Sequence, residues 1–151
     1  MSVVVSANQR TTNDALQNLT DGKLARAYGP VFGNGIRSGA YMLDLGAVKP
    51  VAVISSWSFN QKGNRGRQLV TLFGSDSLTH PGWDLKERSR FVPLGSIDTA
   101  SLADASFYAA SLQARPGRSL GNFRWIVWSV EPTTDLLENT AFQELEVIVV
   151  P

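Results

Sequence analysis

The chain has 151 residues, of which 43% are hydrophobic and 18% charged, and its formal net charge is +1. This length and composition suit one globular domain with a sizeable core. The near-zero net charge argues against a nucleic-acid binder that relies on a basic field. No apolar run is long enough to span a bilayer, and the absence of Cys excludes disulfides and Cys-ligated metals.

The N-terminus, which reads Met1-Ser-Val-Val-Val, has no charged region followed by a long apolar one. We therefore interpret it as a first strand and not as a signal peptide, and we expect a single domain over residues 1–151. A weaker interpretation is that this domain was excised from a longer, exported protein. An extracellular or cell-envelope location would follow only in that case, and the sequence indicates no oligomeric state.

Apolar, β-branched runs recur along the chain between Gly, Pro and Asn residues, a pattern that predicts strands joined by turns. A short helical turn is expected around Ala15, and no long helix is predicted. The expected strands cover residues 3–5, 40–45, 51–59, 68–73, 90–97, 107–113, 122–130 and 141–150. Such spacing favours an all-β sandwich of two antiparallel sheets. The strand at 122–130 is apolar on both faces, which indicates a central position.

Successive loops of an antiparallel sandwich alternate between its two ends. The loops at 21–38, 60–66, 97–106 and 131–140 should therefore gather at one end. Their amides, Arg side chains and aromatic rings suit a polyhydroxylated ligand. These loops carry Tyr28, Phe32, Asn34, Arg37, Asn60, Lys62, Asn64, Arg65, Glu131 and Asp135.

Catalytic interpretations are weaker than a binding one. His80 is the only histidine and precedes Pro81 in a turn, where no hydrolase motif supports it. Glu144 and Glu146 are two residues apart on one strand face, which does not give a glycosidase pair. Residues 33–39 superficially match a dinucleotide loop, but a strand follows them instead of a helix. We therefore expect that the chain is not an enzyme.

Four tryptophans could in principle form a sugar-stacking platform. Buried aromatic residues dominate many β cores, so core packing is the better interpretation for most of them. The four are Trp57, Trp83, Trp125 and Trp128.

Four short motifs appear in a fixed order between residues 13 and 150. They are the turn Asp21-Gly22, a strand that ends in Asp44-Leu45-Gly46, the run 72–76 followed by Trp83, and the closing strand 142–147. In this order they resemble the discoidin-like domains, also called coagulation factor V/VIII type C domains, of the galactose-binding-like superfamily. The resemblance implies a jelly-roll β-sandwich. The terminal disulfide of many such domains is missing here, as is the usual Thr-x-Trp after the first turn.

Members of that family are mostly binding modules, so the resemblance implies a non-catalytic carbohydrate-binding module whose partner is a glycan. It places the main ligand contacts at Asn64 and Arg65. The further expected ligand-binding residues are Asn60, Lys62, Arg37, Asn34, Tyr28 and Phe32. Two alternatives stay open: the 60–66 loop is only a solvated turn, or the chain is a structural or protein-interaction accessory domain of the same fold without a sugar site.

The resemblance also implies a structural Ca²⁺ ion shared by Asp21 and Glu144. Calcium is a hard cation that takes six to eight oxygen ligands, often including carbonyls of tight loops. The alternative is that Lys23 and Arg26 neutralise the two carboxylates instead. No other cofactor is expected.

Overall fold

The structure is a computed structural model that describes residues 3–134 and 139–151. It confirms the prediction of an all-β fold, since one 3₁₀ turn is the only helical segment among these residues. The elements are β1 (Val4–Ala7), β2 (Thr11–Thr12), η1 (Leu16–Thr20), β3 (Val31–Phe32), β4 (Gly39–Phe59), β5 (Leu69–Ser75), β6 (Val92–Asp98), β7 (Phe107–Gln113), β8 (Gly121–Val130) and β9 (Phe142–Val149). No helix in these described residues has the length and apolarity needed to cross a membrane.

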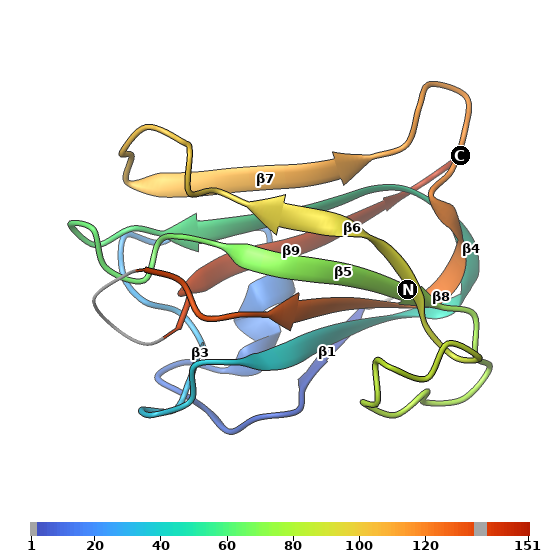
Figure 1. The fold of residues 1–151 in the computed structure, drawn as a ribbon, viewed down its shortest axis with the longest axis horizontal. Coiled ribbons are helices and arrows are strands. Elements are labelled where there is room, and N and C mark those ends of the chain that lie inside the picture. Colours follow the sequence, from blue (N-terminus) through green and yellow to red (C-terminus); the bar gives the residue numbers. More distant parts are fainter. Residues whose placement is uncertain (1–2, 135–138) are drawn as a thin grey trace.

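The strands form two layers that share β4, and β2 and β3 form a small separate pair (Figure 1). In one layer the order is β1-β4-β8-β5-β6, all antiparallel. The second half of β4 pairs with β7 and β9 in the other layer. This is the expected jelly-roll sandwich, with β8 in the predicted central position between β4 and β5.

The prediction of two separate strands at 40–45 and 51–59 is wrong, because both belong to β4. The strand bends where the ladder register shifts between Asp44 and Lys49, and β8 continues to pair beyond the bend. Gly46 has a φ of 79°, which glycine adopts without a Cβ penalty. The chain still reverses here, and both ends of β4 lie at the left of Figure 1.

The main core lies between the two layers and includes Ile54, Leu72, Trp128 and Leu145, all of which are fully buried. A second apolar cluster lies on the other face of the larger layer and contains Met42, Phe73, Phe91, Trp125 and Val127. Loop residues Trp83 and Leu85 pack against that cluster. The apolar residues on both faces of β8 thus each find a partner surface.

The described parts of the loops expected to meet do lie at one end of the sandwich, at the left of Figure 1. Backbone hydrogen bonds tie them together. Asn60 N donates to Ser106 O at 2.8 Å, and Ala141 N donates to Arg65 O at 2.8 Å. Residues from three different connections therefore meet at this end, which we call the loop end.

Candidate functional site

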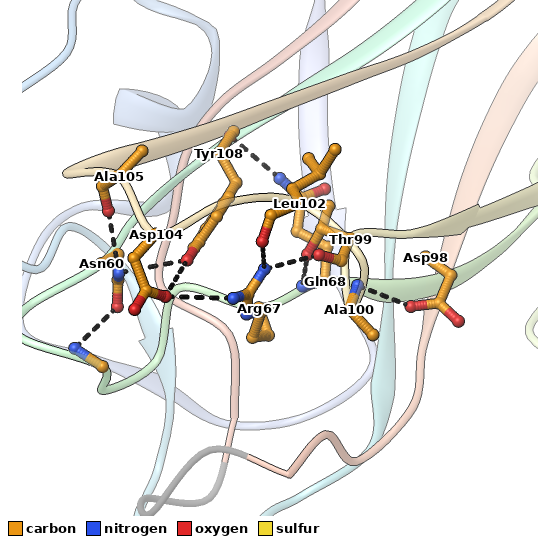
Figure 2. Close-up of polar contacts among 11 residues, drawn as sticks. Asn60, Arg67, Gln68, Asp98, Thr99, Ala100, Leu102, Asp104, Ala105 and Tyr108 are labelled. Atoms are coloured by element: carbon orange, nitrogen blue, oxygen red, sulfur yellow. Dashed lines mark hydrogen bonds and ion pairs between the residues drawn. The ribbon is translucent and has the colours of Figure 1, made fainter.

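The loop between β4 and β5 is anchored to the loop between β6 and β7 by Asn60. Its Nδ2 donates to Ala105 O at 2.8 Å and to the Tyr108 hydroxyl at 3.3 Å (Figure 2). The Asn60 carboxamide oxygen accepts from Gly63 N at 3.0 Å. A Cβ on Gly66 would lie 2.7 Å from Asn60 Cα, so glycine at position 66 lets the loop fold back on itself.

Arg67 fixes the β6–β7 loop from the opposite side, as Figure 2 shows. Its Nη1 donates to Thr99 O at 2.6 Å and to Leu102 O at 2.9 Å. Its Nη2 pairs with Asp104 Oδ1 at 3.1 Å, and its guanidinium lies 4.4 Å from the centre of the Tyr108 ring. The Tyr108 hydroxyl also donates to Asp104, at 3.2 Å. The Asp104 carboxylate is therefore already engaged by two partners.

Between these two loops lies a groove of about 610 Å³. Residues 59–63, residues 104–106 and Arg26 line it, and we call it the loop-end groove. It offers amide, ammonium and guanidinium groups beside Phe59, which is 8% exposed. Donors, acceptors and an aromatic ring in one depression match what hydroxyl-rich ligands need.

Tyr28, Asn64 and Arg65 form a cluster next to this groove. Asn64 Nδ2 donates to the Tyr28 hydroxyl at 2.7 Å, and the Tyr28 ring meets Phe59 edge-on at 6.1 Å. The Arg65 guanidinium lies 5.5 Å from the centre of the Tyr28 ring. Arg65 is only 8% exposed, and its Nε and Nη1 are enclosed without a hydrogen-bond partner. This arrangement differs from a simple solvated turn, because Arg65 is buried.

The structure distributes seven of the eight predicted ligand-binding residues over three places. Asn60 and Lys62 line the loop-end groove, and Tyr28, Asn64 and Arg65 form the adjacent cluster. Asn34 and Arg37 are exposed on the β3–β4 loop, where Arg37 Nη2 donates to Thr133 O at 3.3 Å.

Phe32 does not reach the surface. It is 1% exposed and stacks on Tyr41 with ring centres 4.7 Å apart, so it belongs to the core. The prediction for Phe32 was wrong because burying an aromatic ring is favourable even when the residue belongs to a long connection between strands. Glu131 is exposed at the start of the β8–β9 loop. Asp135, expected in the same loop, lies outside the described residues.

Sequence reasoning missed three residues at the loop end, namely Arg26, Arg67 and Asp104. Asp104 lies in a loop that was expected at this end, and Arg67 directly follows Gly66. Their sequence positions alone could therefore have placed both residues near the loop end. Their contacts could not be predicted, because they join segments that are more than 30 residues apart.

The two predicted calcium ligands lie together beside the start of β9. Glu144 Oε2 accepts from Gly22 N at 3.1 Å, and Asp21 Oδ1 accepts from Lys23 N at 2.9 Å. The pKa of Glu144 is raised to about 7, mainly by burial. The hydrogen bond from Gly22 N opposes this rise, and the charges of Asp21 and Glu146 add to it. Within residues 3–134 and 139–151 no Lys or Arg forms an ion pair with these acids.

The chemistry of this donor set fits a hard cation. Two carboxylates without a basic partner would gain from a positive charge. The described residues contain no group of three or more His, Cys, Asp or Glu placed to hold a metal ion. Backbone carbonyls would therefore have to complete the coordination.

No family model and no curated protein matches this chain. Solved structures do match. The module CpGH89CBM32-5 from Clostridium perfringens, in complex with GalNAc-β-1,3-galactose, superposes with a TM-score of 0.67 at 11% identity, covering 97% of this chain and 95% of that one.

Two further solved structures give the same result. CBM32-1 from a family 31 glycoside hydrolase of Clostridium perfringens has a TM-score of 0.64 at 11% identity, with 96% of this chain and 92% of that chain covered. The CBM32 of AlyQ, in complex with 4,5-unsaturated mannuronic acid, has a TM-score of 0.60 at 14% identity, with 96% and 93% covered. The chain therefore has the galactose-binding-like jelly-roll fold of these modules.

Proposed function

We propose that this chain is a non-catalytic carbohydrate-binding module that binds a glycan at its loop end, as the discoidin-like resemblance also suggests. One observation carries the proposal: two loops tied together by Asn60 and Arg67 hold a groove of about 610 Å³ lined with hydrogen-bonding side chains. Rigid scaffolds that present polar loops are common binding sites. Several modules with this fold have been solved with a bound sugar.

The groove has the parts that sugar recognition uses. Gln61 and Lys62 are exposed and can bond to ring hydroxyls. The half-buried Tyr28 ring adds aromatic surface at one side of the cluster, and the buried Phe59 ring supports it from below at 6.1 Å. Such single sites bind weakly, and a millimolar dissociation constant corresponds to only about 4 kcal/mol. The loss of one good hydrogen bond then removes most of the measurable affinity.

A glycan array followed by calorimetry with the best ligand tests this proposal. Gln61→Ala and Lys62→Ala should weaken binding at least fivefold and leave the melting temperature unchanged, since both side chains are exposed. Asn64→Ala should also weaken binding. Lys86→Ala, an exposed position in the β5–β6 loop, is the matched control and should bind like the wild type. Equal binding by all variants would place the site elsewhere.

The second candidate is an accessory domain for structure or protein interaction, without a sugar site. It is favoured by the fact that no Trp lines the loop-end groove. Trp125 and Trp128 are buried, and Trp57 and Trp83 are half-buried elsewhere. A folded wild-type domain that binds no glycan on the array would support this candidate.

We also propose that Asp21 and Glu144 hold a structural Ca²⁺ ion. The ion would supply the positive charge that the two carboxylates lack among their described neighbours, and it would tie the Asp21 turn to β9. Since the ion binds only the folded state, its effect is on stability.

A further inference from the structure

Arg65 differs from Arg67 because two of its buried guanidinium nitrogens, Nε and Nη1, have no hydrogen-bond partner. Arg67 donates to two carbonyls and a carboxylate. Arg65 is more buried than Arg67, yet its Nε and Nη1 make no hydrogen bond. Folding removes water from these two nitrogens without supplying a hydrogen-bond acceptor, and the Tyr28 ring 5.5 Å away does not supply one. This arrangement is unfavourable for a charged group. An unpaired buried donor pair in a binding surface points to a ligand that completes it.

The charges around Arg65 indicate the sign of that ligand. Arg26 and Lys62 line the neighbouring groove. In the described part of the chain, neither of them nor Arg65 forms an ion pair. Asp104 is the acid of the groove, and Arg67 and Tyr108 already engage it. Three basic side chains are thus left without a counter-charge in a chain whose net charge is only +1.

We propose that the ligand of the loop end is an acidic glycan, whose carboxylate or sulfate binds Arg65. This inference rests on the proposed function and adds the charge of the ligand to it. The guanidinium presents donors in a planar fork that matches the oxygens of a carboxylate or sulfate. A neutral hydroxyl can accept one hydrogen bond but leaves the buried charge unneutralised. Lys62 and Arg26 attract the same anion from the groove.

Tyr28 and Asn64 hold this site in its ligand-free form. The Tyr28 ring lies against the guanidinium, and Asn64 holds the Tyr28 hydroxyl. Because Nε and Nη1 are enclosed, the anion reaches them when the Tyr28 ring turns aside. The ring then remains beside the bound sugar as a stacking surface.

A stability measurement tests the unpaired state of Arg65 without any ligand. Arg65→Met keeps the side-chain length and removes the charge, so the melting temperature should rise or stay the same. The φ of 62° at position 65 is equally unfavourable for Arg and for Met, so the substitution does not change the backbone strain. Arg67→Met is the matched control and should lower the melting temperature, because Arg67 holds the β6–β7 loop. A clear fall for Arg65→Met would show that Arg65 is a structural residue and would overturn the proposal.

Calorimetry with matched sugars tests the ligand class. The probes are tri-galacturonate and tri-mannuronate for the carboxylate, 6-sulfated galactobiose for the sulfate, and galactobiose and mannotriose as neutral counterparts. Wild-type protein should bind at least one acidic probe tenfold more tightly than its neutral counterpart, and 0.3 M NaCl should weaken that binding. Binding of a uronate probe would identify the ligand group as a carboxylate, and binding of the 6-sulfated galactobiose would identify it as a sulfate.

Variants complete this test. Arg65→Met should reduce acidic binding to the neutral level, Lys62→Met should reduce it at least fivefold, and the distant Arg115→Met should leave it unchanged. Equal affinity for acidic and neutral sugars, or a preference that survives in Arg65→Met, would overturn the inference while the proposed function stands. Absence of binding to any of the sugars would instead contradict both. If Arg65→Met fails to fold, that failure itself counts against the proposal.

Discussion

Arg124 and Asp44 form a two-pronged ion pair at the point where β4 bends between the layers. Arg124 Nε donates to Asp44 Oδ1 at 2.8 Å, and Nη2 donates to Oδ2 at 2.9 Å. Asp44 Oδ1 also accepts from Gly46 N at 2.8 Å, inside the bend. The same guanidinium lies 4.8 Å from the centre of the Trp125 ring. The aspartate of the Asp-Leu-Gly triplet therefore links the bend of β4 to β8.

Asp44→Asn should lower the melting temperature at neutral pH. The hydrogen bonds from Arg124 are the main reason that the pKa of Asp44 lies below its ordinary value. A carboxyl group whose pKa is lower in the folded state stabilises the fold at pH values above its unfolded-state pKa. This stabilisation is lost as the pH falls through the folded-state pKa. The difference between variant and wild type should therefore disappear at strongly acidic pH. Thermal unfolding monitored by circular dichroism from pH 2 to 8 measures this.

The exposed Asp76 offers a control for that experiment, because Asp76→Asn should unfold like the wild type at every pH. An unchanged melting temperature for Asp44→Asn at pH 7 would mean that the ion pair contributes nothing to the bend.

Gln68→Met should destabilise the fold by about 1–3 kcal/mol, the range for leaving buried polar partners unsatisfied. Gln68 is 1% exposed. It accepts from Ser56 Oγ at 2.6 Å, and its Nε2 donates to Ser58 Oγ at 3.0 Å and to Tyr108 O at 3.2 Å. Methionine fills the space but leaves Ser56 and Tyr108 O without this partner. Urea unfolding measures the change, and the exposed Gln61→Met should show none.

Strand positions could be predicted from the sequence because alternation and β-branched residues depend on local pattern. The central place of β8 was predicted from apolar residues on both of its faces. Trp125 and Val127 are buried in one apolar cluster, and Ile126 and Trp128 are buried in the other. The continuity of β4 could not be predicted, since a glycine and a proline in a bend look the same as in a turn. Pairing with β8, a non-local contact, carries the strand through it.

The loop end could be located from strand direction alone, but the roles of its residues could not. Phe32 and Arg65 both lie in polar, Gly-rich segments, and both are buried. The burial of these two residues depends on which distant segments fold over them, as Tyr28 does over Arg65. The neighbouring sequence does not predict such contacts. The Arg67 contacts with the β6–β7 loop are long-range for the same reason.

Gly66→Ala should disturb the loop-end groove directly. The added Cβ would lie 2.4 Å from Asn60 Cβ and 2.7 Å from Asn60 Cα, so backbone must move. We expect a loss of about 1–3 kcal/mol, the usual range for overpacking, and faster amide exchange over residues 60–66. Gly29→Ala is the milder comparison, since its nearest neighbour is the flexible Gln143 amide at 3.3 Å. Equal exchange rates in Gly66→Ala and wild type would contradict the tight packing at Asn60.

Glu144 should make the stability of the fold depend on pH, because its pKa is raised, mainly by burial, from an ordinary value of 4.5 to about 7. Between these two values the folded state binds a proton that the unfolded state has released. In EDTA the stability should therefore fall as the pH rises from about 4.5 to about 7, and it should level off above. Glu144→Gln should remove this fall. The difference between variant and wild type isolates the contribution of Glu144, because all other groups are common to both proteins.

Calcium should reverse that loss, because it binds the charged form of Glu144 together with Asp21. At pH 8, Ca²⁺ at 100 times its dissociation constant should stabilise the wild type by about 2.7 kcal/mol, whereas at pH 5 proton competition should reduce the gain. Glu144→Gln should lose most of the calcium effect, and the exposed Glu146→Gln should keep it. Differential scanning calorimetry in EDTA and in excess Ca²⁺ measures each term. Identical melting temperatures for the wild type at pH 8 would show that Asp21 and Glu144 hold no ion, and the pH dependence in EDTA would then reflect the buried carboxyl group alone.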